Sequence, residues 1–129
     1  MDTIISVATE TKDLIEEGTR RFLDEVPALK QLRLVMRLDL RSRRDSQTWR
    51  IELPDIDVKH DPAADAKVTV VAPRSHFNEL AREGKVRHWR EAFQSGTVKA
   101  TGPAEILKLI QNVVEKQEER GRTRKLRAR

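Results

Sequence analysis

Hydrophobic residues recur along the chain with two different spacings, and the points where the spacing changes mark its structural elements. Over residues 14–26 they fall every three or four positions, which predicts one face of a helix that ends near Pro27. Over residues 32–41 apolar and mostly charged positions alternate, which indicates a strand with one buried face. The same alternation over residues 48–53, after a polar turn at 43–46, predicts a β-hairpin.

Shorter alternating segments follow at residues 56–59 and 66–71, and they predict a third and a fourth strand. The helical spacing then returns in two short helices, 73–84 and 86–96, each of which stops at a glycine. A fifth alternating segment covers residues 97–101 and predicts the last strand.

The last predicted helix opens at Gly102-Pro103 and ends at Gly121. Its apolar residues span an arc of roughly 160° on one face, so we expect that face to be buried. They are Ile106, Leu107, Leu109, Ile110, Val113 and Val114. Every predicted strand has one apolar and one polar face, which favours an α+β domain with helices on one side of a single sheet.

The length and the charge distribution divide the chain. Its 129 residues suit one domain with one hydrophobic core. The net charge of +5 comes entirely from residues 116–129, which hold seven basic and two acidic side chains, whereas the preceding 115 residues carry 19 charges of each sign. We therefore predict a domain over residues 1–118 and a basic, disordered tail over residues 119–129.

The sequence contains few residues or motifs that could support catalysis. It has no cysteine, which excludes disulfides, thiolate nucleophiles and zinc–thiolate sites. It has no glycine-rich phosphate loop and no nucleophile motif, so we expect no catalytic residue. Two pairs with helical spacing, His76 with Glu79 and His88 with Glu91, suit a shared metal ion. We favour solvated helix positions for these pairs and expect neither a metal nor a cofactor.

The chain also lacks a signal peptide and any apolar run of membrane-spanning length, so we expect a cytoplasmic protein.

The aromatic residues leave two interpretations open. They are Phe22, Trp49, Phe77, Trp89 and Phe93. In one interpretation they fill the core. In the other, some of them line an apolar cavity, because two short helices cover a sheet less completely than one long helix.

An ordered series of short motifs fills the second half of the chain. The segments are Ala-Asp-Ala-Lys-Val-Thr-Val over residues 64–70, Phe77-x-x-Leu80-x-x-x-Gly84-Lys85-Val86, Trp89-x-x-Ala92-Phe93-x-x-Gly96-x-Val98-Lys99-x-x-Gly102 and Ile106-Leu107-Lys108-Leu109. Together with the hairpin that holds Trp49, this series resembles the sterol carrier protein two family. The resemblance covers roughly residues 10–118.

The resemblance implies a five-stranded, mostly antiparallel sheet covered by helices, with an apolar tunnel between the layers. It also implies a non-catalytic domain that binds or transfers a hydrophobic ligand, such as a fatty acid, a fatty acyl-CoA, a sterol-like molecule or a phospholipid. The residues that it implies as the tunnel lining are Met36, Leu38, Trp49, Ile51, Phe77, Leu80, Trp89, Phe93, Ile106 and Ile110.

The basic tail suggests a separate role. Near acidic lipid each basic residue contributes about 1 kcal/mol, so transient contact with an anionic membrane surface is one hypothesis. The residues proposed for this contact are Arg122, Arg124, Lys125, Arg127 and Arg129. A nucleic-acid or ribosome-associated module is an alternative that we favour less, because the tail has no aromatic residue to stack on bases. An accessory protein-interaction domain without a ligand is the third hypothesis.

The tail departs from the family pattern in two ways. It offers only Leu126 where family tails often place an apolar lid, and it ends in Leu-Arg-Ala-Arg, which is not a peroxisomal address.

Overall fold

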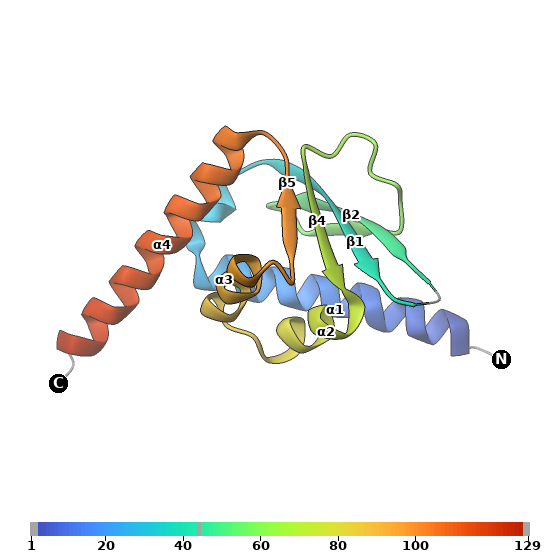
Figure 1. The fold of residues 1–129 in the computed structure, drawn as a ribbon, viewed down its shortest axis with the longest axis horizontal. Helices are drawn as coiled ribbons and strands as arrows, with labels where there is room; N and C mark the ends of the chain where they lie inside the picture. The colour runs from blue at the N-terminus through green and yellow to red at the C-terminus, as the bar shows by residue number, and fades with distance from the viewer. Residues whose placement is uncertain (1–2, 44, 128–129) are drawn as a thin grey trace.

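The computed structural model describes the backbone of residues 3–43 and 45–127 and the side chains of residues 10–43 and 45–120. Helices and strands follow the predicted order, with one 3-10 helix added (Figure 1). The elements are α1 (Thr3–Glu25), η1 (Pro27–Gln31), β1 (Leu34–Arg41), β2 (Gln47–Leu53), β3 (Asp57–Lys59), β4 (Val68–Pro73), α2 (Arg74–Glu83), α3 (Val86–Ser95), β5 (Lys99–Thr101) and α4 (Ala104–Arg127). The predicted α+β class is confirmed.

The sheet has the strand order β3-β2-β1-β4-β5 and is mostly antiparallel, as predicted. Its central strand, β1, pairs antiparallel with β2 and parallel with β4. Leu38 of β1 lies opposite Trp49 on one side and Val70 on the other. Since side chains alternate along each strand, this register brings the apolar positions of three strands onto one face.

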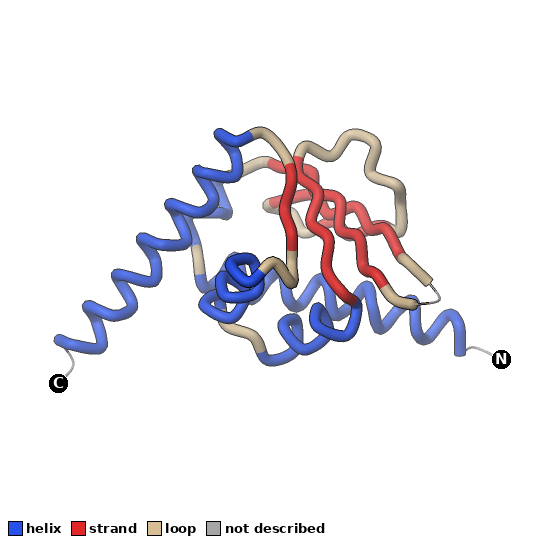
Figure 2. Tube along the Cα trace, in the orientation of Figure 1, coloured by secondary structure: helices blue, strands red, loops and turns tan. Residues whose placement is uncertain are grey.

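The helical layer is built from three connected helices. In Figure 2, α1, α2 and α3 lie together below the strands. α1 packs along α2, and the backbone N–H of Val86 at the start of α3 donates to the carboxylate of Glu25 at 3.1 Å. This hydrogen bond fastens the first turn of α3 to the end of α1.

Helix α4 differs from the sequence prediction in where it ends and in how much of its apolar face is buried. It continues through Gly121 to Arg127, because a glycine inside a helix costs only about 1 kcal/mol relative to alanine. Its C-terminal half projects beyond the other elements in Figure 1. Among its six apolar residues named above, Val114 alone is buried and Leu109 is 49% exposed. The predicted burial of the whole apolar face is therefore wrong, because α4 leans away from the sheet and packs against η1.

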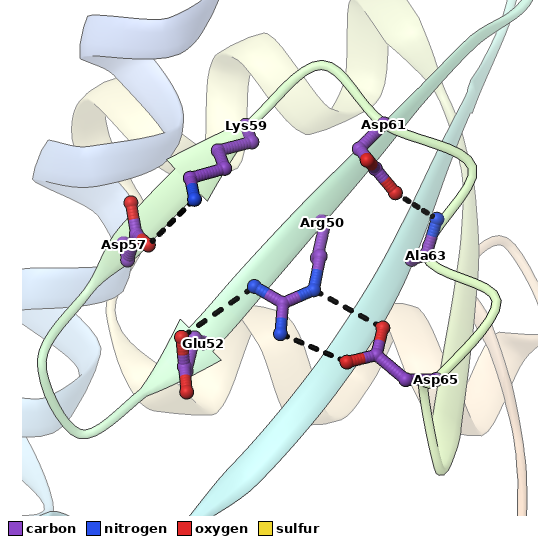
Figure 3. A network of polar contacts seen from close by, with 7 residues as sticks. All are labelled: Arg50, Glu52, Asp57, Lys59, Asp61, Ala63 and Asp65. Atoms are coloured by element: carbon purple, nitrogen blue, oxygen red, sulfur yellow. Dashed lines mark hydrogen bonds and ion pairs between the residues drawn. The ribbon is translucent and has the colours of Figure 1, made fainter.

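The opposite face of the sheet carries a charged network around Arg50 of β2 (Figure 3). Its Nε and Nη2 donate to the two carboxylate oxygens of Asp65 at 3.1 and 2.9 Å, and its Nη1 lies 3.5 Å from Oε2 of Glu52. Asp65 belongs to the loop before β4, in which Asp61 accepts the N–H of Ala63 at 2.7 Å. The hydrogen bonds from Arg50 lower the pKa of Asp65 and fasten this loop to β2.

We predict that Asp65→Asn destabilises the domain at neutral pH and that this difference disappears in acid. A carboxyl with a lowered folded-state pKa contributes stability that is fully present above its ordinary pKa of about 3.9 and is lost as the pH falls through the folded value. Urea unfolding of both proteins between neutral and acid pH measures the difference. Asp55→Asn, at an exposed aspartate of the β2–β3 turn, is the control. A difference that persists unchanged in acid contradicts the ion-pair assignment.

The contact between α1 and α2 depends on a small residue. Gly18 of α1 is buried against Ala81 of α2, and a Cβ atom added at Gly18 would lie 3.0 Å from the Ala81 Cβ. The two helices therefore approach each other more closely at this point than a larger side chain permits.

We predict that Gly18→Val lowers the free energy of unfolding by about 1–3 kcal/mol, because the added carbon atoms push α1 away from α2. Glu17→Val is the matched control, since Glu17 is the exposed neighbour on the same helix. Urea unfolding followed by circular dichroism measures both variants. Equal losses in the two would show that the close contact has no special role.

Candidate functional site

The candidate site lies between the apolar face of the sheet and the helices. On the sheet, Leu38 of β1 and Trp49 of β2 are neighbours in register, and each is 3% exposed. Met36 and Ile51 form the next pair of that face on the same two strands. Ile51 is buried and Met36 is half-buried, so these four predicted residues form one continuous apolar patch.

The helices supply an aromatic cluster. Phe77 and Leu80 of α2 are buried, and their spacing of three puts them on one helix face. Trp89 of α3 packs edge-on against Phe77 and Phe22, with ring centroids 5.8 and 6.3 Å apart. Because Trp89 itself is only half-buried, the cluster reaches the surface at α3.

Nine of the ten predicted lining residues belong to one hydrophobic core or pack against it. The buried members are Leu38, Trp49, Ile51, Phe77 and Leu80. The half-buried members are Met36, Trp89, Ile106 and Ile110. The tenth residue, Phe93 of α3, is 39% exposed. The structure thus places nine of the residues in or against the same core, and the role of all ten as ligand contacts stays a prediction.

The apolar surface is least covered on α3 and α4. Phe93 and Leu109 are exposed large hydrophobic residues of these helices. An ion pair between Arg90 Nη1 and Glu118 Oε2, 3.1 Å apart, joins α3 to α4. The remaining atoms Arg90 Nε and Glu118 Oε1 are buried and make no hydrogen bond in the described structure. The two side chains are 38% and 17% exposed, and ion pairs that remain in contact with water add at most about 1 kcal/mol to stability.

The histidines make contacts of other kinds. His88 Nδ1 accepts the backbone N–H of Lys85 at 2.8 Å and so completes the first turn of α3. His60 stacks on Trp49 with ring centroids 4.7 Å apart. The sequence alone does not predict this stack, because the contact depends on the register of β2 with β3. Among the side chains that the structure describes, no group of three or more His, Cys, Asp or Glu is placed to hold a metal ion.

An open hollow of about 650 Å³ lies at the carboxyl ends of β1 and β4, and we call it the arginine hollow. Its lining residues are Arg41, Ser42, Arg43, Arg74, Ser75 and Asn78. None of the predicted lining residues belongs to it. The sequence alone does not predict this hollow, because its lining comes from two segments, residues 41–43 and 74–78, that are far apart along the chain.

The residues proposed for anionic-surface contact lie outside the described side chains. They are Arg122, Arg124, Lys125, Arg127 and Arg129. The structure describes the backbone of residues 119–127 as helix where the sequence predicted disorder. The membrane contact and the division of the chain after residue 118 stay predictions.

No helix in the described part of the chain combines the length and the apolar character needed to cross a membrane.

The fold and the site together define a small α+β domain whose single sheet turns one apolar face toward a layer of helices. A model of the SCP-2 sterol transfer family matches residues 16–115, and the chain belongs to this family. The resemblance drawn from the sequence motifs is thereby confirmed.

Solved structures of the same fold extend over most of the chain. The crystal structure of sterol carrier protein 2 like 2 from Aedes aegypti is 19% identical with a TM-score of 0.59, and the match covers 84% of this chain and 97% of that one. The solution structure of palmitated SCP2L2 from the same species is 17% identical with a TM-score of 0.55, over 78% and 93% of the two chains. The ubiquinone synthesis protein UbiJ-SCP2 is 21% identical with a TM-score of 0.52, over 92% and 96%. No curated protein sequence matches the chain significantly.

We predict that Phe77→Ala lowers the free energy of unfolding by about 3–5 kcal/mol, because it leaves a cavity under the aromatic cluster. Phe93→Ala, the same substitution at an exposed position of α3, should lower it by less than about 1 kcal/mol. Urea unfolding compares the two variants with the parent. Similar losses in both would mean that Phe93 is as well packed as Phe77.

Proposed function

We propose that this domain binds one long-chain hydrophobic molecule between the apolar face of its sheet and its helices, and carries or presents that molecule unchanged. The observation that carries the proposal is that Trp89 of α3 and Ile106 and Ile110 of α4 are only half-buried. Helix faces that only close a core are normally buried. An alkyl chain laid along these residues gains about 0.8 kcal/mol for each methylene group that leaves water.

The character of the predicted lining supports a lipid as the ligand. None of the ten residues carries a charge, so recognition would depend on shape and on the exclusion of water. The family is named for sterol transfer, and one neighbour of the same fold is described as palmitated. We keep a fatty acid, a fatty acyl-CoA, a sterol-like molecule and a phospholipid as candidate ligands. The ubiquinone synthesis neighbour adds an isoprenoid quinone to the candidates.

The proposal includes no chemistry on the ligand. The predicted lining residues offer no nucleophile, acid or base. We also propose a cytoplasmic location and a transient contact of the tail with an anionic membrane, as the sequence suggested. A nucleic-acid role of the tail gains no support from the fold or from the related proteins.

The test places a charge at the proposed ligand surface. Ile110 is a half-buried residue on the apolar face of α4, and Ile110→Glu should weaken the binding of palmitate roughly tenfold or more, because the carboxylate loses its hydration beside an alkyl chain. Titration of tryptophan fluorescence with palmitate measures the affinity. Native mass spectrometry of the freshly purified protein shows whether it already carries a lipid.

Leu109→Glu is the matched control, since Leu109 is the next residue of the same helix and is 49% exposed. It should leave the affinity unchanged. The proposal is overturned if the parent protein carries no lipid in native mass spectrometry and its fluorescence shows no saturable change with palmitate or with a short-chain ubiquinone. Equal weakening by both substitutions would move the site away from the buried side of α4.

A further inference from the structure

Three arginines gather around the arginine hollow, and the sheet topology places them there. β1 and β4 run parallel, with Arg41 opposite Pro73 in the register. The turn after β1 therefore meets the first residues of α2 at one end of the sheet. This brings Arg41, the last residue of β1, and Arg43 of the following turn together with Arg74, the first residue of α2.

The lining of the hollow contains no carboxylate to neutralise these guanidinium groups. On the neighbouring strand β2, Arg50 holds Asp65 through two hydrogen bonds. Within the side chains that the structure describes, Arg41 and Arg43 form no ion pair, and both are exposed. The hollow therefore keeps a local positive charge, although residues 1–115 as a whole carry 19 charges of each sign.

Two of the groups around the hollow, Arg74 and Ser42, are held by hydrogen bonds. Arg74 Nη2 donates to the hydroxyl of Thr11 at 3.3 Å, a contact with α1 that orients its side chain. The hydroxyl of Ser42 accepts the backbone N–H of Asp45 at 3.0 Å. Ser75 and Asn78 line the hollow from α2 and add a hydroxyl and an amide to the three guanidinium groups.

We propose that the arginine hollow binds a phosphate group, carried either by a lipid headgroup or by a small soluble phosphoester. Guanidinium groups recognise phosphate oxygens through paired, parallel hydrogen bonds. Three like charges around one hollow repel each other, and the attraction of each to a bound anion offsets that repulsion. The site is separate from the apolar surface described above and does not depend on the proposed function.

The test removes two of the three charges and leaves the third, which contacts α1, in place. Arg41→Gln with Arg43→Gln alters two exposed residues, one at the end of β1 and one in the following turn. Arg33→Gln with Arg87→Gln is the matched control, because these exposed arginines lie at the opposite end of β1 and on α3 and the change in net charge is the same. The tail is identical in all three proteins, so it contributes equally to each.

Two arms distinguish the sources of the phosphate. Co-sedimentation with phosphatidylcholine vesicles, with and without phosphatidylglycerol, measures binding to a lipid headgroup. Titration with glycerol 3-phosphate, followed through the backbone amide signals of Ser42 and Ser75, measures binding of a soluble phosphoester. Each arginine removed should weaken the binding of the phosphate-bearing ligand about fivefold, so the hollow variant should bind about 25-fold more weakly than the parent in one of the two experiments. The affinity of the control variant should change by less than about threefold.

Loss in the vesicle arm identifies a lipid headgroup, and loss in the titration identifies a soluble phosphoester; either result supports the site. Equal weakening in the hollow variant and the control overturns it, because that result reports net charge alone. Absence of binding by the parent protein in both arms overturns it as well. The same conclusion follows if the hollow variant loses affinity only for a polyuridine RNA. Unfolding in urea checks that both variants keep the stability of the parent.

Discussion

The parallel pairing of β1 with β4 is the constraint on which the rest of the structure depends. Parallel neighbours need a connection that returns the chain to the starting end of the sheet, and β2, β3 and the loop before β4 supply it. The register of Leu38 with Val70 keeps the apolar residues of both strands on one face. A slip of one residue would turn one of these strands over. The core and the network of Arg50 on the outer face therefore depend on the same alignment.

This pairing also separates two surfaces of different chemistry within one small domain. The face of the sheet is covered by helices and is apolar, whereas the carboxyl ends of β1 and β4 meet at its edge, where Arg41 lies beside the start of α2. A ligand with an alkyl chain would thus meet the apolar face of the sheet. A surface that carries phosphate groups would meet the edge where Arg41 lies. Neither part needs residues of the other, so substitutions in one leave the other available as an internal control.

The sequence predicted the order and type of the elements because periodic burial is a local property. It placed the start of the fourth strand two residues early: Ala66 donates its N–H to Ala63 in a turn, and β4 begins at Val68. Contacts between segments that are far apart along the chain could not be predicted from these local patterns. The stack of His60 on Trp49 and the arginine hollow both follow from strand pairing. The apolar arc of α4 indicated a face that avoids water, but not whether another element covers it.

The covering layer is closed at one place and open at another, and this difference bears on how a ligand enters. α1 and α2 meet closely at Gly18 and Ala81, where an added methyl carbon would lie 3.0 Å from the Ala81 Cβ, so separating them breaks close packing along both helices. α4 is joined to α3 by the partly exposed ion pair of Arg90 with Glu118, and Val114 is the buried one among the apolar residues of α4 that the structure describes. Displacing α4 therefore costs less than displacing α1. On the proposed function, the ligand enters beneath α4, where the half-buried isoleucines lie, and the charged network of Arg50 on the far face stays intact during exchange.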